Sequence, residues 1–211
     1  MEELMREMEK DGLVMEIVAE EWDMFQRVNN ASGRADCQDN WKTFNIMRSS
    51  QLEAWGLDVL VSYLEDIRQA KAEGVNLLSE KYAYMMENTA PDEFREIQDR
   101  LRPVEEEKKL MVKRIVKQHV EWMDEMVEKY PGVAGRGRPV HAAQDSPYAV
   151  SFETYLGGEL YTYSVGTLEK YYQYVRKLQE EGKNIDEMIL LNTAKHYGYS
   201  SLEEAERQIK G

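Results

Sequence analysis

The spacing of apolar residues in this chain is that of amphipathic helices. Between residues 13 and 29, valine, isoleucine, tryptophan and phenylalanine recur at intervals of three and four positions, which places them on one face of a helix. Comparable segments follow up to residue 209, and no segment shows the alternation that is typical of a β-strand. The pattern predicts an all-α protein.

Glycine, proline and capping residues divide this pattern into separate helices. Asp36 and Ser200 are the expected caps of two of them, because a side-chain oxygen at that place accepts a hydrogen bond from a free backbone N–H. The expected helices span residues 13–29, 37–55, 57–73, 76–88, a short segment opened by Pro91, 104–129, 151–181, 185–196 and 201–209. Residues 131–150 form the long connection, of a length that is usually functional or mobile.

The second half of the chain resembles the first. When residues 44–77 are shifted by 108 positions, eight of 34 are identical, whereas about two are expected from ordinary residue frequencies. The identical pairs include Phe44 and Phe152, Tyr63 and Tyr171, and Asn76 and Asn184. The alternative explanation is that amphipathic helices rich in glutamate, leucine and tyrosine resemble one another without common descent.

An internal duplication would make the chain a helical bundle built from two related helical halves, approximately 13–102 and 103–211, around a pseudo-two-fold axis. Each half would have one apolar face, and the two faces are best buried against each other. We therefore expect a single compact domain over residues 1–211, with a cleft between the halves where a ligand is commonly bound.

Two loops carry the arginines that point to an anionic ligand. Arg34 follows the helix that contains Glu21-Trp22, and Arg136 and Arg138 follow the helix that contains Glu121-Trp122. Neighbouring glycines let backbone amides approach an anion, and a guanidinium group binds carboxylate or phosphate through two hydrogen bonds. The alternative is that each arginine pairs with a nearby carboxylate and fixes its own loop.

Four residues are candidates for catalytic chemistry. Cys37 lies at an expected helix start, where the helix dipole favours a thiolate nucleophile; the alternative, which is the commoner role of a free cysteine, is a small buried core residue. Glu121, Glu153 and Glu159 are candidate acids or bases, since a carboxyl group in a dry cleft exchanges protons near neutral pH.

The same loops and helices provide the candidate ligand-binding residues. Tyr155, Glu159 and Tyr163 recur at four-residue steps, which on one continuous helix is either a site or a buried hydrogen-bond network. The candidate ligand-binding residues are Trp22, Arg34, Asp36, Gln38, Asp39, Trp122, Arg136, Arg138, Tyr155 and Tyr163. A purely structural role for these motifs is the competing hypothesis.

Composition excludes several classes of partner and site. The formal net charge of −13 argues against nucleic acid, because phosphate backbones attract clustered lysine and arginine. A single cysteine and a highly charged start favour a cytoplasmic protein, and no apolar run approaches the roughly 20 residues of a membrane span. The three histidines are scattered, so we expect no metal site.

Several of these motifs together resemble an uncharacterised bacterial family, the domain of unknown function 4125. The resemblance spans roughly residues 13–205 and rests on Gly33-Arg34-Ala35, Cys37-Gln38-Asp39, Ile46-Met47-Arg48, Ala134-Gly135-Arg136-Gly137-Arg138-Pro139 and Glu153-Thr154-Tyr155-Leu156. It implies a bacterial source and membership of that family, and it brings no known activity or cofactor.

Two functions are consistent with the sequence. The first is a cytoplasmic enzyme or ligand-binding protein that holds a small anionic molecule between the halves. The second is a helical interaction or regulatory module that acts on a protein partner or on a second copy of itself, with the polar motifs purely structural. The sequence does not decide between them, and it specifies neither a reaction nor a cofactor.

Overall fold

The protein is built from helices throughout the part of the chain that the structure describes. The computed structural model describes residues 1–29, 33–146 and 148–210, and these contain no β-strand. The helices are α1 (Glu2–Gln26), α2 (Trp41–Glu53), α3 (Leu57–Ala72), α4 (Leu77–Thr89), α5 (Pro91–Ile97), α6 (Glu106–Lys129), α7 (Phe152–Leu160), α8 (Val165–Glu180), α9 (Ile185–His196) and α10 (Leu202–Lys210). Short 3-10 helices occupy Asp36–Asp39, Gln98–Arg100 and Ala142–Gln144.

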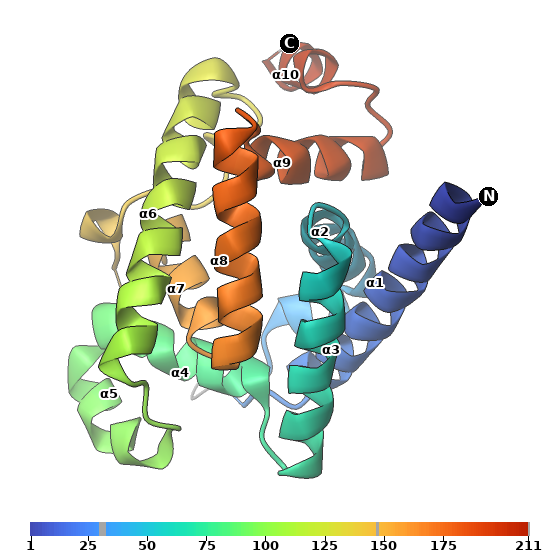
Figure 1. Cartoon of the computed structure of the whole chain (residues 1–211). Coiled ribbons are helices and arrows are strands. Elements are labelled where there is room, and N and C mark those ends of the chain that lie inside the picture. Colours follow the sequence, from blue (N-terminus) through green and yellow to red (C-terminus); the bar gives the residue numbers. More distant parts are fainter. Residues whose placement is uncertain (30–32, 147, 211) are drawn as a thin grey trace.

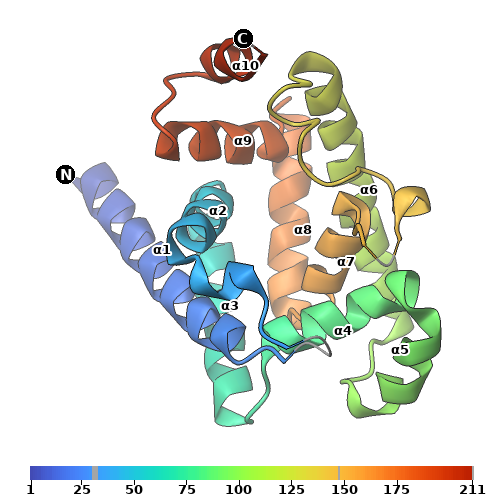
Figure 2. The same ribbon diagram turned by 180° about the vertical axis from the view of Figure 1, so that it is seen from behind.

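Helices α1–α4 and α6–α9 make the same contacts in the same order. α1 packs against α2, α3 and α4, and α6 packs against α7, α8 and α9. Between the two sets, α3 packs on α8, α4 on α7 and α2 on α9 (Figures 1 and 2). The second helix of each set therefore packs on the fourth helix of the other set, and the two third helices pack on each other.

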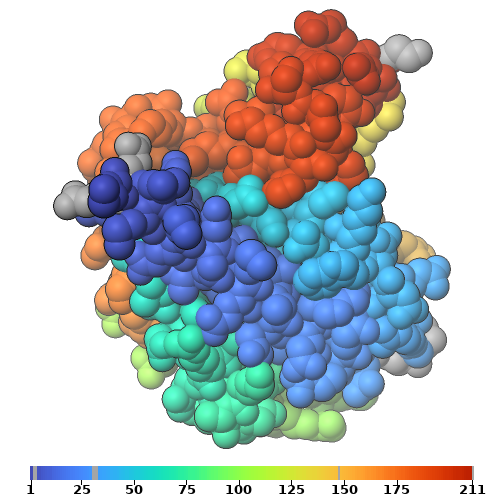
Figure 3. Space-filling model, turned by 90° about the vertical axis from the view of Figure 1, so that its right-hand side faces the viewer, coloured from blue at the N-terminus to red at the C-terminus, as the bar shows by residue number. Residues whose placement is uncertain are grey.

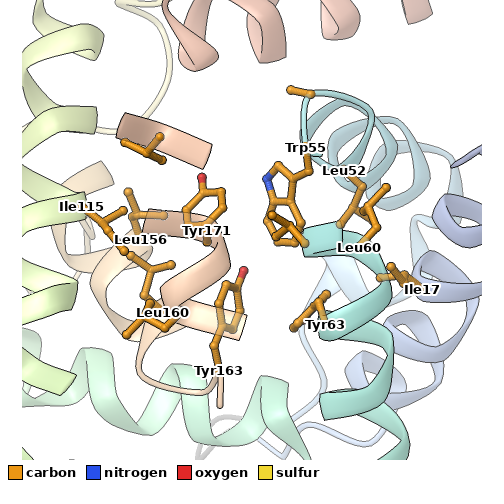
Figure 4. Close-up of a cluster of buried hydrophobic side chains, with 14 of the residues drawn as sticks. Ile17, Leu52, Trp55, Leu60, Tyr63, Ile115, Leu156, Leu160, Tyr163 and Tyr171 are labelled. Carbon is orange, nitrogen blue, oxygen red and sulfur yellow. The ribbon is translucent and has the colours of Figure 1, made fainter. Parts of the chain in front are cut away.

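The centre of the core is an aromatic cluster where α3 meets the residues around α8. Trp55 and Tyr63 face Tyr163 and Tyr171 across this junction (Figure 4). The ring centroids of Tyr63 and Tyr163 are 4.8 Å apart, and those of Trp55 and Tyr171 are 5.2 Å apart. Each such pair contributes about 0.5–1.5 kcal/mol beyond the burial of its area. The cluster thus holds the two sets of helices together.

Two asparagines cap matching helices and tie them to matching partners. The Asn76 side chain caps α4 and donates to the Met24 carbonyl of α1 at 2.8 Å. The Asn184 side chain caps α9 and donates to the Trp122 carbonyl of α6 at 3.2 Å. Each cap therefore sets the angle at which the fourth helix of its set leaves the first.

The last helix closes one end of the molecule. The Glu206 carboxylate of α10 accepts from the backbone amides of Gly132 and Val133, each at 2.8 Å, at the end of α6. Leu202 and Ala205 pack into a second apolar cluster with residues of α6 and α9. In Figure 3, α9 and α10 lie above α1 and α2. α10 is therefore a cover over the ends of α6 and α9.

Two predicted helix starts differ from the structure. α1 begins at Glu2 instead of residue 13, because its first turns are rich in good helix formers although they carry no buried apolar face. The helix predicted from Cys37 begins at Trp41, where the Asn40 side chain accepts from the Thr43 amide at 3.1 Å. Asp36 lies in a 3-10 turn, so its predicted role as the cap of α2 is wrong.

Two further predictions are corrected near the end of the chain. The helix predicted over 151–181 is two helices, because α7 ends at Leu160 and Ser164 caps the start of α8. Tyr163 lies in the connection between them and not on the same helix as Glu159. Ser201, and not Ser200, accepts the capping hydrogen bond of α10 from the Glu204 amide at 3.2 Å.

Candidate functional site

A buried arginine on α2 is neutralised by a buried carboxylate on α1. The Nε and Nη2 atoms of Arg48 donate to the two oxygens of Glu21 at 2.7 and 2.6 Å. The exposed fractions of Glu21 and Arg48 are 1% and 8%. The Tyr63 hydroxyl donates to the same carboxylate at 2.7 Å, and burial, with Glu21 adding to it, raises the pKa of this phenol well above its ordinary value. The two-pronged pairing fixes the plane of the guanidinium group.

A second carboxylate, Glu159 on α7, joins this pair to the other set of helices. It accepts hydrogen bonds from Arg48 Nη1 at 3.1 Å, Lys81 Nζ at 2.6 Å, Gln51 Nε2 at 2.9 Å and the Tyr163 hydroxyl at 2.9 Å. Burial alone would raise the pKa of Glu159, but the charges of Arg48 and Lys81 outweigh it and hold this pKa well below its ordinary value. Glu159 is therefore a carboxylate anion.

These charges form a balanced set at the junction of the two sets of helices. The carboxylates of Glu21 and Glu159 are matched by the cations of Arg48 and Lys81. Taking each ion out of water costs several kcal/mol, and only the pairing offsets that cost. The network is thus a weak source of stability, but it fixes the positions of four polar side chains along one wall of a cavity.

The cavity beside this network has a volume of about 230 Å³. It lies between α1, α2 and α4 on one side and α7 with the loop before it on the other. Its walls are aromatic and aliphatic as well as charged; the lining includes Glu21, Phe25, Cys37, Asn40, Phe44, Met47, Arg48, Leu77, Leu78, Lys81, Tyr82, Arg138, Tyr155 and Glu159. Residues from both predicted halves therefore enclose it, and we call it the first cavity.

Two cations lie over the ring of Tyr155 in the first cavity. The Lys81 Nζ atom is 3.5 Å from the centre of this ring, and the Arg138 guanidinium carbon is 4.2 Å from the same centre. Burial would raise the pKa of the Tyr155 phenol, but the charge of Lys81, assisted by Arg48, outweighs it and lowers this pKa. Nearby, burial and Tyr155 raise the pKa of Tyr82 to about 12. Two phenols in one cavity thus differ in acidity.

Four of the predicted site residues come together at the first cavity. Cys37 and Arg138, from the two loops, and Tyr155 and Glu159, from α7, all line it. Tyr163 supports it from behind, through its hydrogen bond to Glu159. The two loops therefore converge on one hollow, although each contributes a single one of the candidate side chains.

The remaining candidates of the first loop stabilise the loop itself. Arg34 pairs with Asp39, with Nη2 2.8 Å from Oδ1, and it also donates to the Gln38 carbonyl. The buried Gln38 side chain donates to the carbonyls of Phe25 and Val28 at 2.7 and 3.0 Å. Asp36 is exposed in the same turn. These contacts match the alternative reading of the loop, in which the arginine fixes its own segment.

Three candidates of the second half also lie away from the first cavity. Arg136 donates to the Ile209 carbonyl of α10 at 3.0 Å. Glu121 is exposed and pairs with Lys117 at 3.2 Å on the surface of α6. Glu153 accepts from the backbone amide of residue 142 at 2.7 Å and holds the long loop against α7. None of the three therefore lines the first cavity: Glu121 lies on the surface of α6, and Arg136 and Glu153 hold the long loop in place.

The two tryptophans of the predicted Glu-Trp pairs lie in different surroundings. Trp122 is buried and meets His119 edge-on, with ring centres 5.7 Å apart. Trp22 is half-buried and packs with Trp41 and Phe44 at ring distances of 5.2 and 5.1 Å. Phe44 lines the first cavity, so Trp22 is one side chain removed from it.

Sequence reasoning missed Arg48, Lys81 and Tyr82 as site residues. The signal that could have revealed Arg48 and Lys81 was a charged residue at a position on the buried face of its helix. Lys81 lies four residues after Leu77 and four before Met85, and both of these are buried. Such a position places a charge in the core, where it requires a partner from another helix.

No metal or membrane element is found in the described segments. Among residues 1–29, 33–146 and 148–210, no cluster of three or more histidine, cysteine, aspartate or glutamate side chains is arranged to hold a metal ion. Over the same residues, no helix has the length and hydrophobicity needed to span a bilayer.

The fold and the buried ionic network define an all-helical protein with a charged cavity between two sets of helices. The chain belongs to the family described as "Protein of unknown function (DUF4125)", whose model matches residues 11–207. The expected family is thereby confirmed over nearly the whole chain. No curated protein and no solved structure matches this chain.

Proposed function

We propose that the protein binds a small anionic molecule with an apolar body in the first cavity. The observation that carries this proposal is the state of Arg138. Among the described residues, Arg138 forms no ion pair, and its one hydrogen bond is a long contact of 3.4 Å to the Val150 carbonyl. Its remaining N–H groups are available at the rim of the cavity, so it can bind a carboxylate or phosphate oxygen pair.

The charge balance of the cavity supports an anion. The positive charges of Arg48 and Lys81 are balanced by the negative charges of Glu21 and Glu159, so the network is neutral as a whole. Arg138 adds one positive charge, in a protein whose overall charge is −13. A local positive charge of this kind selects a monoanion from solution and disfavours a cation.

The size and walls of the cavity support a ligand with one ring or a comparable apolar group. An engineered protein cavity of about 150 Å³ holds benzene, so 230 Å³ accommodates a ring with a charged substituent. Phe25, Phe44 and Tyr155 supply aromatic surface to its walls. The acidic phenol of Tyr155 is the group best placed to exchange a proton with such a ligand, and it is our candidate acid or base should the protein be an enzyme.

Binding of benzoate tests this proposal, with phenyl phosphate as a second anion and benzamide as a neutral analogue of benzoate. Titration calorimetry should show binding of at least one anion and weaker binding of benzamide. Arg138→Ala should weaken anion binding about ten- to a hundredfold, because a hydrogen bond to a charged group contributes about 1.5–3 kcal/mol.

Arg136→Ala is the matched control for this experiment. It removes an exposed arginine of the same loop that contacts α10 and does not line the first cavity. Its anion affinity should equal that of the unaltered protein. Equal losses in the two variants, or equal binding of benzoate and benzamide, would contradict the proposal, as would binding of neither anion.

We also propose that the two halves, 13–102 and 103–211, arose by duplication and form one domain in the cytoplasm. The matched contacts of α1 and α6, and the matched caps Asn76 and Asn184, support this proposal. So does the pairing of Glu21 with Tyr63, because His119 pairs with Tyr171 in the same way at 3.0 Å. In this proposal Glu21 corresponds to His119 and not to Glu121, although Glu21 and Glu121 both precede a tryptophan.

A further inference from the structure

A second cavity lies on the other side of the wall formed by Tyr155 and the Arg48–Glu159 pair. It has a volume of about 450 Å³, and it extends between α6 and α9 to the inner side of α10. The two cavities share five lining residues: Met47, Arg48, Arg138, Tyr155 and Glu159. They are thus neighbours with a common partition.

The second cavity is built from the same positions of its helices as the first. On the first helix of each set, Glu21 and Phe25 line the first cavity and His119 and Met123 line the second, 98 positions later. On the following helices the spacing is 108 positions, in the pairs Phe44 and Phe152, Met47 and Tyr155, and Tyr63 and Tyr171. The two cavities therefore occupy corresponding positions in the two sets of helices.

The second cavity differs chemically from the first at the positions that carry a cation or a phenol in the first. Three residues of the first cavity and their counterparts in the second are Arg48 and Leu156, Lys81 and Ile189, and Tyr82 and Leu190. At these counterpart positions two cations and a phenol are replaced by three aliphatic side chains, while Arg48 itself also faces the second cavity from the partition. Toward α10, Ala194 and Ala205 add apolar surface from α9 and α10, beside the polar side chains of Thr193, Tyr197 and Tyr199.

Four buried charged or titratable side chains of the second cavity, His119, Asp186, Arg48 and Glu159, are hydrogen-bonded to one another or to neighbouring side chains. His119 is 1% exposed; its Nδ1 atom is 2.9 Å from Asp186 Oδ2, and its Nε2 atom is 3.0 Å from the Tyr171 hydroxyl. Arg48 and Glu159 are bonded to each other at the partition. These four groups offer no unpaired charge to a ligand; Arg138, which has no ion pair among the described residues, lies at the partition shared with the first cavity. The aliphatic walls favour the transfer of apolar surface out of water.

We propose that the second cavity is a separate binding site for an uncharged, mainly apolar small molecule. The protein thus has two equivalent positions for ligands, one for an anion and one for a neutral compound. The α10 helix covers the second position and is held there by Glu206. A neutral ligand gains from the aliphatic surface of the second cavity, whereas Arg138, the cation that would attract an anion, lies at the partition that both cavities share.

Fluorescence titration with N-phenyl-1-naphthylamine tests this site, because the probe is neutral and becomes fluorescent in apolar surroundings. We expect saturable binding of one probe per chain, and no displacement by saturating benzoate or phenyl phosphate. A crystal structure of the complex should show the probe between α6, α9 and α10. Absence of saturable binding, displacement by the anions, or a probe located elsewhere would overturn the proposal.

Two reciprocal variants provide the matched controls. Leu190→Tyr places a phenol in the second cavity at the position of Tyr82, and it should weaken probe binding at least tenfold. Tyr82→Leu alters the first cavity alone and should leave probe binding unchanged. Both melting temperatures are measured first; if Leu190→Tyr does not fold, the competition experiment on the unaltered protein still decides. Because the anion assay reports on the first cavity, each proposal can fail independently of the other.

Discussion

Arg48 on α2 and Glu159 on α7 form a buried ion pair, with Nη1 and Oε1 3.1 Å apart, between segments separated by 111 positions in the chain. The contact joins the two sets of helices at the partition between the cavities. Arg48 is bound to Glu21 at its other edge, so the three residues form a continuous chain from α1 to α7. The stability of the protein and the shape of its cavities therefore depend on the same contacts.

Replacing Glu159 should strongly destabilise the protein. Glu159→Gln removes the negative charge that pairs with Lys81 and that, together with Glu21, pairs with Arg48. The variant leaves buried positive charge without a partner. Loss of one partner of a buried pair costs about 3–5 kcal/mol. Urea denaturation should show a loss of that size in the free energy of unfolding.

The matched control for this prediction is Glu121→Gln on α6. Glu121 is exposed and forms a surface pair with Lys117, and such pairs contribute about 0.3–0.5 kcal/mol. Its loss of stability should be several times smaller than that of Glu159→Gln. Equal effects in the two variants would show that the buried network carries no special energetic role.

The contribution of Glu159 should persist in moderately acidic solution. Its pKa in the folded protein lies well below its ordinary value, which is about 4.3 in an unfolded chain. A group with a depressed folded pKa stabilises the fold fully above its unfolded pKa, and the contribution declines as the pH falls from there toward the folded pKa. The difference in stability between the unaltered protein and Glu159→Gln should therefore be constant from neutral pH down to about 5 and shrink below about 4.3. A difference that grows on acidification would contradict the depressed pKa.

Tyr155 should ionise at lower pH than an ordinary tyrosine. Lys81 lies 3.5 Å from the ring centre, and its charge outweighs the effect of burial on the Tyr155 pKa. The ultraviolet absorbance of tyrosinate, followed during an alkaline titration, should contain one early step below the usual pKa of about 10. Tyr155→Phe should remove this step, and Tyr82→Phe should preserve it because the pKa of Tyr82 is raised to about 12. An early step that survives Tyr155→Phe would assign it to another phenol.

The sequence predicted the helices better than it predicted the site. Periodicity identified an all-α fold because apolar residues at helical spacing must share a buried face. It did not separate α7 from α8, since Ser164 begins a new helix through a cap that periodicity does not register. Under the proposed duplication, Glu21 corresponds to His119, which has the buried position and the tyrosine contact, and not to Glu121, although Glu21 and Glu121 both precede a tryptophan.

The residues that line the first cavity were recognised only in part from the sequence, for a physical reason. Loop residues such as Arg138 and Cys37 were recognisable by their chemistry, and both line the first cavity. Arg48 and Lys81 were not recognised, because a charged residue in a helix is usually solvated. Their burial depends on Glu159, which is distant in the chain, and no local pattern encodes that contact.

Two adjacent glycines of α7 should respond oppositely to alanine. A Cβ atom at Gly158 would lie 2.9 Å from the Lys81 carbonyl oxygen and 2.7 Å from Met85 Cγ, so α4 would have to move away from α7. Overpacking of this kind costs roughly 1–3 kcal/mol.

At Gly157 a Cβ atom would meet nothing within 4 Å, and alanine is better than glycine inside a helix by about 0.5–1 kcal/mol. Chemical denaturation should therefore show that Gly158→Ala is less stable, and Gly157→Ala more stable, than the unaltered protein. Because Lys81 of α4 lines the first cavity, Gly158→Ala should also weaken benzoate binding, whereas Gly157→Ala should leave it unchanged. Stabilisation of the protein by Gly158→Ala would show that α4 and α7 do not pack this closely.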